Sequence, residues 1–186
     1  TYISYPIFGA PIDANQNFTL YASGNMLVKT WMGKVASAMT TYQKSCFKRF
    51  FEELKITQAL NLPYLPKIID FGLSTSTACV YLVTEMVKGE AWSTVIEGLT
   101  EDEKNELSLQ LLHSLKKFHE HGFQHGNLDD EKILVDKTNL KVSFNDCFHP
   151  EVPQPDSSNA YFPSDIEDPT VIQCDNFTAL KLIADL

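Results

Sequence analysis

Residues 125–135 read HGNLDDEKILV, a polar and charged loop that runs directly into a short apolar strand. A turn cluster at 136–139 separates this strand from a second apolar run, Leu140–Phe144. Two apolar runs joined by a short polar cluster predict a β-hairpin. The loop at 125–132 should therefore present its charged side chains immediately ahead of this hairpin.

The helix expected upstream of this loop has clear signals at both ends. Thr100 and Glu103 form the capping-box pattern that starts a helix, and Gly122 is the residue type expected just beyond its end. Between them, leucines at 107, 111 and 115 and a phenylalanine at 118 recur at helical spacing. This pattern predicts a long helix with one buried face.

The first half of the chain alternates turn signals with apolar runs. Turn clusters at 13–17 and 23–25 precede a strand at 26–31. Apolar residues near helical spacing predict a helix from Thr41 to Leu60. Residues 67–72 and 79–84 read as a hairpin that turns at 74–77. This half is predicted to be a small sheet with one helix.

The segment 148–174 contains five prolines and is predicted to be irregular, with a helix resuming at Asp175. Between Val142 and Leu180 there is no lysine or arginine, against seven acidic residues. Strands, one helix, more strands, a long helix, a hairpin and a final helix together predict an α+β fold.

Composition excludes several classes of protein. The chain has 186 residues, 44% hydrophobic content and a net charge of −9, and Arg49 is its one arginine, so it lacks the basic patch of a nucleic-acid binder. It has neither the long apolar run of a membrane span nor a signal peptide, so we expect a cytoplasmic protein. No C-x-x-C pair occurs, so we expect reduced thiols rather than zinc ligands at Cys46, Cys79, Cys147 and Cys174.

The loop at 125–135 and the order of elements around it resemble the protein kinase family, whose catalytic loop reads H-R-D-L-x-x-x-x-N before an apolar strand. The resemblance covers nearly the whole chain. It implies a bilobal fold with an N-lobe at 1–87, made of a small antiparallel sheet and one helix. Residues 88–186 would form part of a mainly helical C-lobe, which stops just after the activation-segment region.

The resemblance also implies that the catalytic residues have been replaced. Asn127 stands where kinases have the aspartate that accepts the proton of the substrate hydroxyl, and an amide cannot take that proton. Lys132 stands at the magnesium-binding asparagine, and its ammonium would repel the metal. Asp129 stands at the catalytic-loop lysine and would repel a phosphate. Gly126 stands at the arginine that anchors a phosphorylated activation segment.

The kinase metal motif D-F-G is degraded as well. Two registers are open, one over 145–147 and one over 144–146, and Asn145 occupies the metal position in the first. Asp146 lies one or two places away and is a weak metal candidate. The sequence Asp70-Phe71-Gly72 spells the motif, but it precedes the catalytic loop and is predicted to be part of a strand.

A nucleotide pocket is the part of the kinase pattern that persists. By the resemblance, Lys29 would contact phosphates and pair with Glu53, with Glu52 as the alternative. Thr84 would be the gatekeeper, and the backbone of Glu85, Met86 and Val87 would face an adenine. The glycine-rich loop, residues 6–11, keeps one glycine, and Pro11 removes an amide donor.

The implied function is that of a pseudokinase, a regulatory or scaffolding module that acts through a protein partner or a neighbouring domain. It would admit ATP without magnesium. The alternative is an enzyme with rewired chemistry that transfers a nucleotidyl or other group, with metal ligands drawn from Asp129, Asp130, Glu131 and Asp146. The resemblance makes Asp175 structural, bracing the catalytic loop through its backbone.

Overall fold

The computed structural model describes residues 5, 9–14, 17–32, 39–74 and 76–186. The chain divides into two compact units. The first comprises residues 1–62 and 66–86, and the second comprises residues 63–65 and 87–186. No helix in the described part of the chain is long and apolar enough to cross a membrane.

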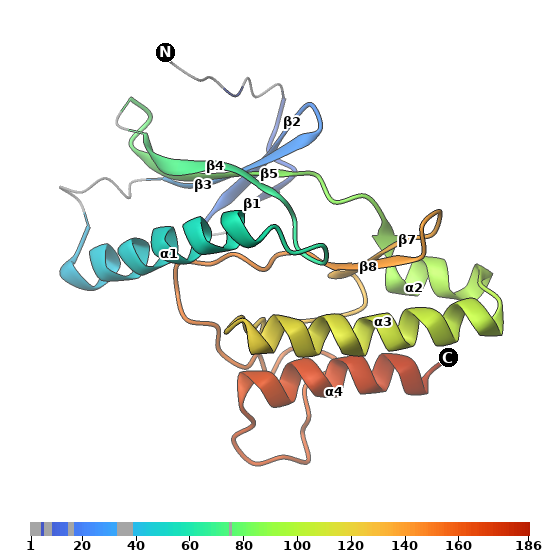
Figure 1. Ribbon diagram of the computed structural model, residues 1–186. Helices are drawn as coiled ribbons and strands as arrows, with labels where there is room; N and C mark the ends of the chain where they lie inside the picture. Colours follow the sequence, from blue (N-terminus) through green and yellow to red (C-terminus); the bar gives the residue numbers. More distant parts are fainter. Residues whose placement is uncertain (1–4, 6–8, 15–16, 33–38, 75) are drawn as a thin grey trace. The chain divides into compact units, whose positions relative to one another are not determined.

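The first unit is a five-stranded antiparallel sheet with one long helix (Figure 1). The strand order is β1-β2-β3-β5-β4, and α1 contacts β4. The elements are β1 (Asp13–Ala14), β2 (Thr19–Ser23), β3 (Met26–Met32), α1 (Thr41–Leu60), β4 (Ile68–Ser74) and β5 (Cys79–Glu85).

Helix α1 has the bounds that the sequence predicts. Thr40 and Gln43 form a capping box at its start, and Asn61 ends it in the left-handed conformation, with φ 47°. Its buried face carries Phe47 and Phe50, which pack edge-on against Trp31 of β3 with ring centroids 6.2 and 5.5 Å apart. This aromatic cluster forms the core between the helix and the sheet.

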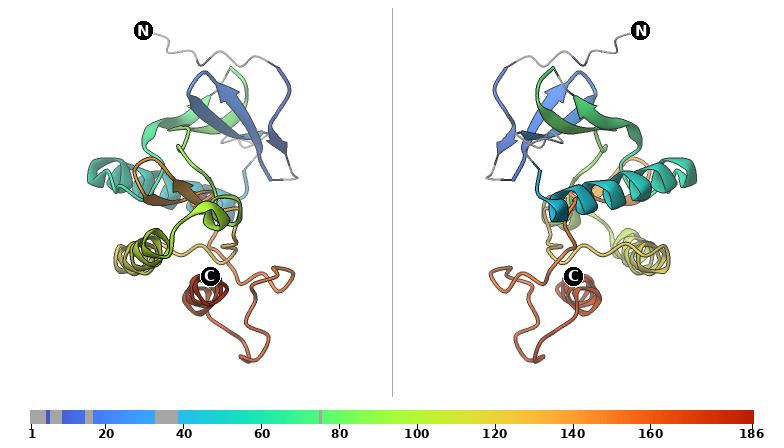
Figure 2. Two further views of the ribbon diagram at one scale, coloured as in Figure 1. Left: turned by 90° about the vertical axis from the view of Figure 1, so that its right-hand side faces the viewer. Right: turned by 90° about the vertical axis from the view of Figure 1, so that its left-hand side faces the viewer.

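The second unit combines a small three-stranded sheet, in the order β6-β7-β8, with two long helices. Its elements are β6 (Glu90–Ala91), α2 (Trp92–Val95), a 3₁₀ turn (Ile96–Gly98), α3 (Glu101–Glu120), β7 (Ile133–Asp136), β8 (Lys141–Phe144) and α4 (Val171–Ala184). Helices α3 and α4 lie side by side, as the end-on views in Figure 2 show.

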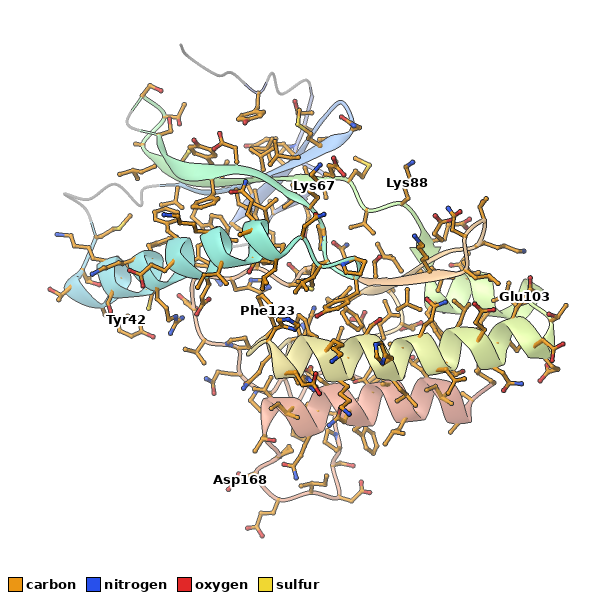
Figure 3. The ribbon with its side chains drawn as sticks, viewed as in Figure 1. Tyr42, Lys67, Lys88, Glu103, Phe123 and Asp168 are labelled. Carbon is orange, nitrogen blue, oxygen red and sulfur yellow. The ribbon has the colours of Figure 1, made fainter. Side chains whose placement is uncertain are left out.

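The predicted features of α3 are confirmed. Thr100 and Glu103 form the capping box, and the four residues of the predicted stripe are almost fully buried. Figure 3 shows Glu103 at the beginning of the helix and Phe123 just beyond its end. Gly122 follows the cap residue His121 with φ 83°, as expected of a C′ glycine. The β7–β8 hairpin and the β4–β5 hairpin also form as predicted.

Two local predictions need correction, and two short elements were not predicted. Helix α4 begins at Val171, four residues before the predicted start, because Thr170 and Gln173 form a capping box that the proline-rich context obscured. The cluster at 13–17 is not wholly a turn, because Asp13 and Ala14 pair with β2 as an edge strand. The short elements β6 and α2 were not anticipated, since β6 forms by pairing with β7 and α2 packs against both strands.

Candidate functional site

A buried carboxylate organises the candidate site in the second unit. Asp175 of α4 is 0% exposed, and its two oxygens accept from the backbone N–H groups of His125 (2.9 Å) and Gly126 (2.8 Å). Nε2 of His119, near the end of α3, donates to the same carboxylate at 3.1 Å. The prediction that Asp175 braces this loop through its backbone is confirmed.

His125 is a neutral structural residue. The N–H of Asn127 donates to its Nδ1 at 3.3 Å, and its Nε2 donates to the carbonyl oxygen of Asn145 at 2.9 Å. This pair of bonds requires a proton on Nε2 and none on Nδ1. Burial lowers the pKa of His125, which favours the same uncharged form.

The tip of the loop is closed by an ion pair between two substituted positions. Nζ of Lys132 lies 2.6 Å from Oδ2 of Asp129, and each side chain is 23% exposed. The other carboxylate oxygen of Asp129 accepts from the N–H groups of Glu131 (3.0 Å) and Lys132 (2.8 Å). The residues at the kinase lysine and asparagine positions therefore neutralise each other, and the carboxylate also caps a turn.

Asn127 is bound to a segment far along the chain. Its Oδ1 accepts from Nδ2 of Asn159 at 2.6 Å, and the same amide donates to the carbonyl oxygen of Leu128 at 3.0 Å. Sequence reasoning did not find Asn159. The turn-forming residues Asp156, Ser157 and Ser158 before it were the available signal, but they do not indicate what a turn will contact.

A cavity of about 340 Å³ lies between this loop and the segment 156–161. Burial and the nearby charge of Asp130 raise the pKa of Tyr161 to about 12. One ammonium faces four carboxylates, so the cavity disfavours a phosphate group. Its lining residues are Asn127, Asp129, Asp130, Glu131, Lys132, Asp156, Ser158, Asn159, Ala160 and Tyr161.

The residues of the degraded metal motif stabilise the loop through their backbone groups. The N–H of Asn145 donates to the carbonyl oxygen of Lys132 at 2.8 Å, so both backbone polar groups of Asn145 bind the loop. Asp146 is left-handed, with φ 55°, and its Oδ1 lies 3.4 Å from Nε2 of His149. Within the described ranges, no three His, Cys, Asp or Glu side chains are grouped to hold a metal ion.

The first unit holds the residues predicted to contact phosphate. Lys29 is only 7% exposed, and its Nζ lies 3.9 Å from the centroid of the Phe18 ring. Glu53 instead lies on the outer side of α1, 53% exposed and 3.3 Å from Arg49 one turn earlier. The predicted pair of Lys29 with Glu53 is therefore replaced by a local pair within the helix. Residues 6–8 of the expected glycine-rich loop lie outside the described residues.

The end of β5 was predicted to face an adenine, but some of its backbone hydrogen-bonding groups are used within the protein. Thr84 is buried, as a core position would be. The N–H of Glu85 donates to the carbonyl oxygen of Lys67 at 2.9 Å, and the N–H of Met86 donates to that of Asn25 at 2.8 Å. These two amides are therefore used by the protein, and adenine recognition through Val87 and the backbone carbonyls stays a prediction.

Comparisons with known proteins identify the family. The protein kinase domain model matches residues 25–146. Serine/threonine-protein kinase csk1 of Schizosaccharomyces pombe is 27% identical over 84 residues, which cover 45% of this chain and 27% of csk1. Serine/threonine-protein kinase pkn2 of Myxococcus xanthus is 32% identical over 98 residues, which cover 52% of this chain and 12% of pkn2.

Solved structures share the fold. Rad53 1–466 in complex with AMP-PNP superposes with a TM-score of 0.64 at 21% identity, covering 96% of this chain and 46% of that one. An apo pseudokinase gives a TM-score of 0.55 at 14% identity, covering 76% and 57%. The chain spans less than two thirds of each relative. The predicted kinase-like α+β fold is confirmed, and because the family model matches more than half of the chain, this protein belongs to the protein kinase family.

Proposed function

We propose that this protein is a pseudokinase domain, a regulatory or scaffolding module of the cytoplasm that binds a protein partner or a neighbouring domain and transfers no phosphoryl group. The observation that carries the proposal is the ion pair of Asp129 with Lys132 at 2.6 Å. These positions hold the phosphate-neutralising and metal-binding groups in kinases, and here they satisfy each other.

The chemical argument rests on three missing functions. Asn127 carries an amide, which has no basic lone pair near neutral pH and therefore cannot serve as a general base, and its oxygen already accepts from Asn159. An ammonium beside the metal position disfavours magnesium, and the carboxylates of Asp129 and Asp130 repel phosphate. Loss of a single electrostatic group of this kind typically costs about 3–4 kcal/mol of transition-state stabilisation. Losing base, metal site and phosphate contact together supports an inactive domain.

A phosphoryl-transfer assay tests the proposal directly. The protein is incubated with γ-labelled ATP, magnesium or manganese, and a generic protein substrate, beside an active kinase as positive control. We expect no label on the substrate or on the protein itself. Transfer by the wild type that disappears in Lys29→Ala would overturn the proposal. Intact-mass measurement of the same samples would reveal a nucleotidyl adduct, the product expected of the alternative enzyme.

Nucleotide binding forms the second part of the proposal. Lys29 is retained, and we expect ATP to raise the unfolding temperature equally with and without magnesium, by linkage of binding to stability. Lys29→Ala should abolish the rise. Lys67→Ala is the matched control, because Lys67 is an exposed lysine of the same unit, paired only loosely with Glu85 at 3.7 Å. Absence of any shift in the wild type would remove ATP from the proposal and leave the non-catalytic module.

A further inference from the structure

The segment 148–170, between β8 and α4, has no regular secondary structure, yet it is fastened at defined points. It runs beside α4 (Figure 2), with Asp168 in its outer part (Figure 3). Pro163 and Pro169 are buried, while most residues of 164–168 are exposed. The kinase resemblance would hold such a segment through a phosphate bound by arginine, but glycine occupies that arginine position. Other contacts must therefore hold the segment in place of that phosphate.

The first fastening is a close backbone approach at Gly126. A Cβ atom placed on this residue would lie 2.7 Å from the carbonyl oxygen of Gln154, a separation that real side chains do not adopt. Gly126 also has φ 78°, a conformation that costs other residues about 1 kcal/mol or more. The absence of a side chain at 126 thus creates the space in which the backbone at 154 lies.

The second fastening is the side-chain amide of Asn159. It donates to Asn127 and to the carbonyl oxygen of Leu128, and its own Oδ1 accepts from the N–H of Tyr161 at 2.8 Å. Asn159 sits in a preformed turn, because the carboxylate of Asp156 accepts from the N–H and the hydroxyl of Ser158. A rigid turn therefore presents one amide to two acceptors on the loop.

The third fastening comes from α4 and from the acidic side of the loop. Nζ of Lys181 donates to the carbonyl oxygen of Ala160 at 3.3 Å and lies 5.2 Å from the ring centroid of Tyr161. Asp130 of the loop lies near the Tyr161 hydroxyl, and its charge contributes to the raised pKa of that group. Residues 154–161 are thus held from two sides, by the loop and by the final helix, and none of these bonds requires a modification.

We propose that residues 154–161 form a strap that is clamped onto the former catalytic loop through Gly126 and through the Asn127–Asn159 amide pair, so that the segment is ordered constitutively and without a phosphate. The replaced catalytic positions become the attachment points of the strap. The strap also forms one wall of the 340 Å³ cavity and keeps that cavity in its observed shape. This inference concerns order rather than catalysis, so it stands or falls separately from the proposed function.

Hydrogen–deuterium exchange of phosphatase-treated protein tests the strap. In the wild type, amides of 154–162 should be protected without phosphate. Asn159→Ala should raise their exchange rate about tenfold, because both bonds to the loop are lost. Ser157→Ala is the matched control, since Ser157 is an exposed residue of the same turn and its side chain makes none of the bonds described above, and it should leave exchange unchanged. Asn127→Asp should also behave like the wild type, because a carboxylate keeps the acceptor.

A double variant gives the decisive comparison. If Asn127 and Asn159 act as one pair, Asn127→Ala combined with Asn159→Ala should exchange no faster than Asn159→Ala alone. Unchanged protection of α3 amides in each variant verifies that the unit remains folded, and Asn127→Ala serves as the test if Asn159→Ala does not fold. The strap is refuted if the amides of 154–162 are unprotected in the wild type, or if they exchange equally fast in Asn159→Ala and in the wild type. It is also refuted if the double variant exchanges faster than Asn159→Ala, by the additional factor seen for Asn127→Ala alone.

Discussion

The two ends of the loop 125–132 differ in what they preserve of a kinase. At the first end, the backbone of His125 and Gly126 is held by the buried carboxylate of Asp175, an interaction that the kinase resemblance itself predicted. At the other end, a carboxylate at Asp129 replaces the lysine of a kinase, an ammonium at Lys132 replaces the neutral asparagine, and the two new charges bind each other. The scaffold of the loop has been retained while its chemistry has been replaced.

The physical difference between the two ends is burial. An unpaired charge buried at Asp175 would cost several kcal/mol, so its three donors are strongly constrained. Asp129 and Lys132 are partly exposed, where an ion pair contributes little and substitution is cheap. Replacement of the catalytic-loop residues is therefore compatible with a stable fold, because the positions that transfer phosphate in kinases are not the positions that hold this loop together.

The largest effect should come from the scaffold end. Asp175→Ala leaves the two loop amides and the His119 ring without their acceptor in a buried site, and we expect unfolding free energy to fall by roughly 3–5 kcal/mol. Urea denaturation measures it. Asp185→Ala, at the exposed end of the same helix, should change stability by less than about 0.5 kcal/mol. Equal effects of the two variants would show that the buried carboxylate is not the organising group.

A substitution at Gly126 should have the next largest effect. It tests how closely the backbone of residues 154–161 packs against this position. Gly126→Ala combines a left-handed φ with a contact of 2.7 Å to Gln154, and should cost roughly 2–4 kcal/mol. Gly122→Ala is the matched control, because Gly122 has φ 83° but nothing within 4 Å of its Cβ position. Gly122→Ala should lower the unfolding free energy only by the cost of placing alanine in the left-handed conformation, about 1 kcal/mol. If the two costs are equal in urea denaturation, the strap does not occupy the space above Gly126.

The pH dependence of stability should report His125. Burial lowers the pKa of His125 in the folded protein, so below about pH 6.5 the unfolded chain binds more protons than the folded one. The stabilisation is complete above the unfolded pKa and is lost as pH falls toward the folded one. His125→Gln should flatten the fall in unfolding free energy between pH 7 and pH 5. If the dependence of unfolding free energy on pH is unchanged in His125→Gln, a group other than His125 is responsible for it.

The smallest effect should come from the tip of the loop. Lys132→Met removes a single, partly exposed ion pair, and unfolding free energy should fall by about 1 kcal/mol or less. Lys116→Met, which breaks a looser and more exposed pair with Glu120 at 3.9 Å, should have no measurable effect. A loss above about 3 kcal/mol in Lys132→Met would mean that the tip is as structural as the Asp175 end, and the contrast between the two ends would fail.

The local predictions succeeded where short-range physics decides the structure. Capping residues at Thr100 and Glu103, and a stripe of apolar residues at helical spacing, determine α3 without help from the rest of the chain. The same holds for α1 and for both predicted hairpins. The start of α4 was missed because prolines nearby outweighed the capping signal at Thr170, although the prolines all lie before the helix.

The candidate site was predictable in its identities and less so in its contacts. The resemblance to the kinase catalytic loop identified Asn127, Asp129 and Lys132 as replaced catalytic positions, and their side chains argued against the usual chemistry before any geometry was known. The partner of Asn127 lies 32 residues away, in a segment without periodicity. Nothing local to Asn159 indicates that partner, because a turn residue has the same sequence signature whatever it contacts.

The sequence by itself determined the order of elements and the ends of α1 and α3, since these follow from residue type and spacing, and its resemblance to the kinase catalytic loop indicated which chemical groups have been replaced. Only the tertiary structure decided that Asp129 and Lys132 neutralise each other, that Glu53 pairs with Arg49, and that residues 154–161 are fastened onto Gly126 and Asn127. The reason is physical: periodicity and capping act within a few residues, whereas the partner of a polar side chain depends on which distant segments the packed chain brings together.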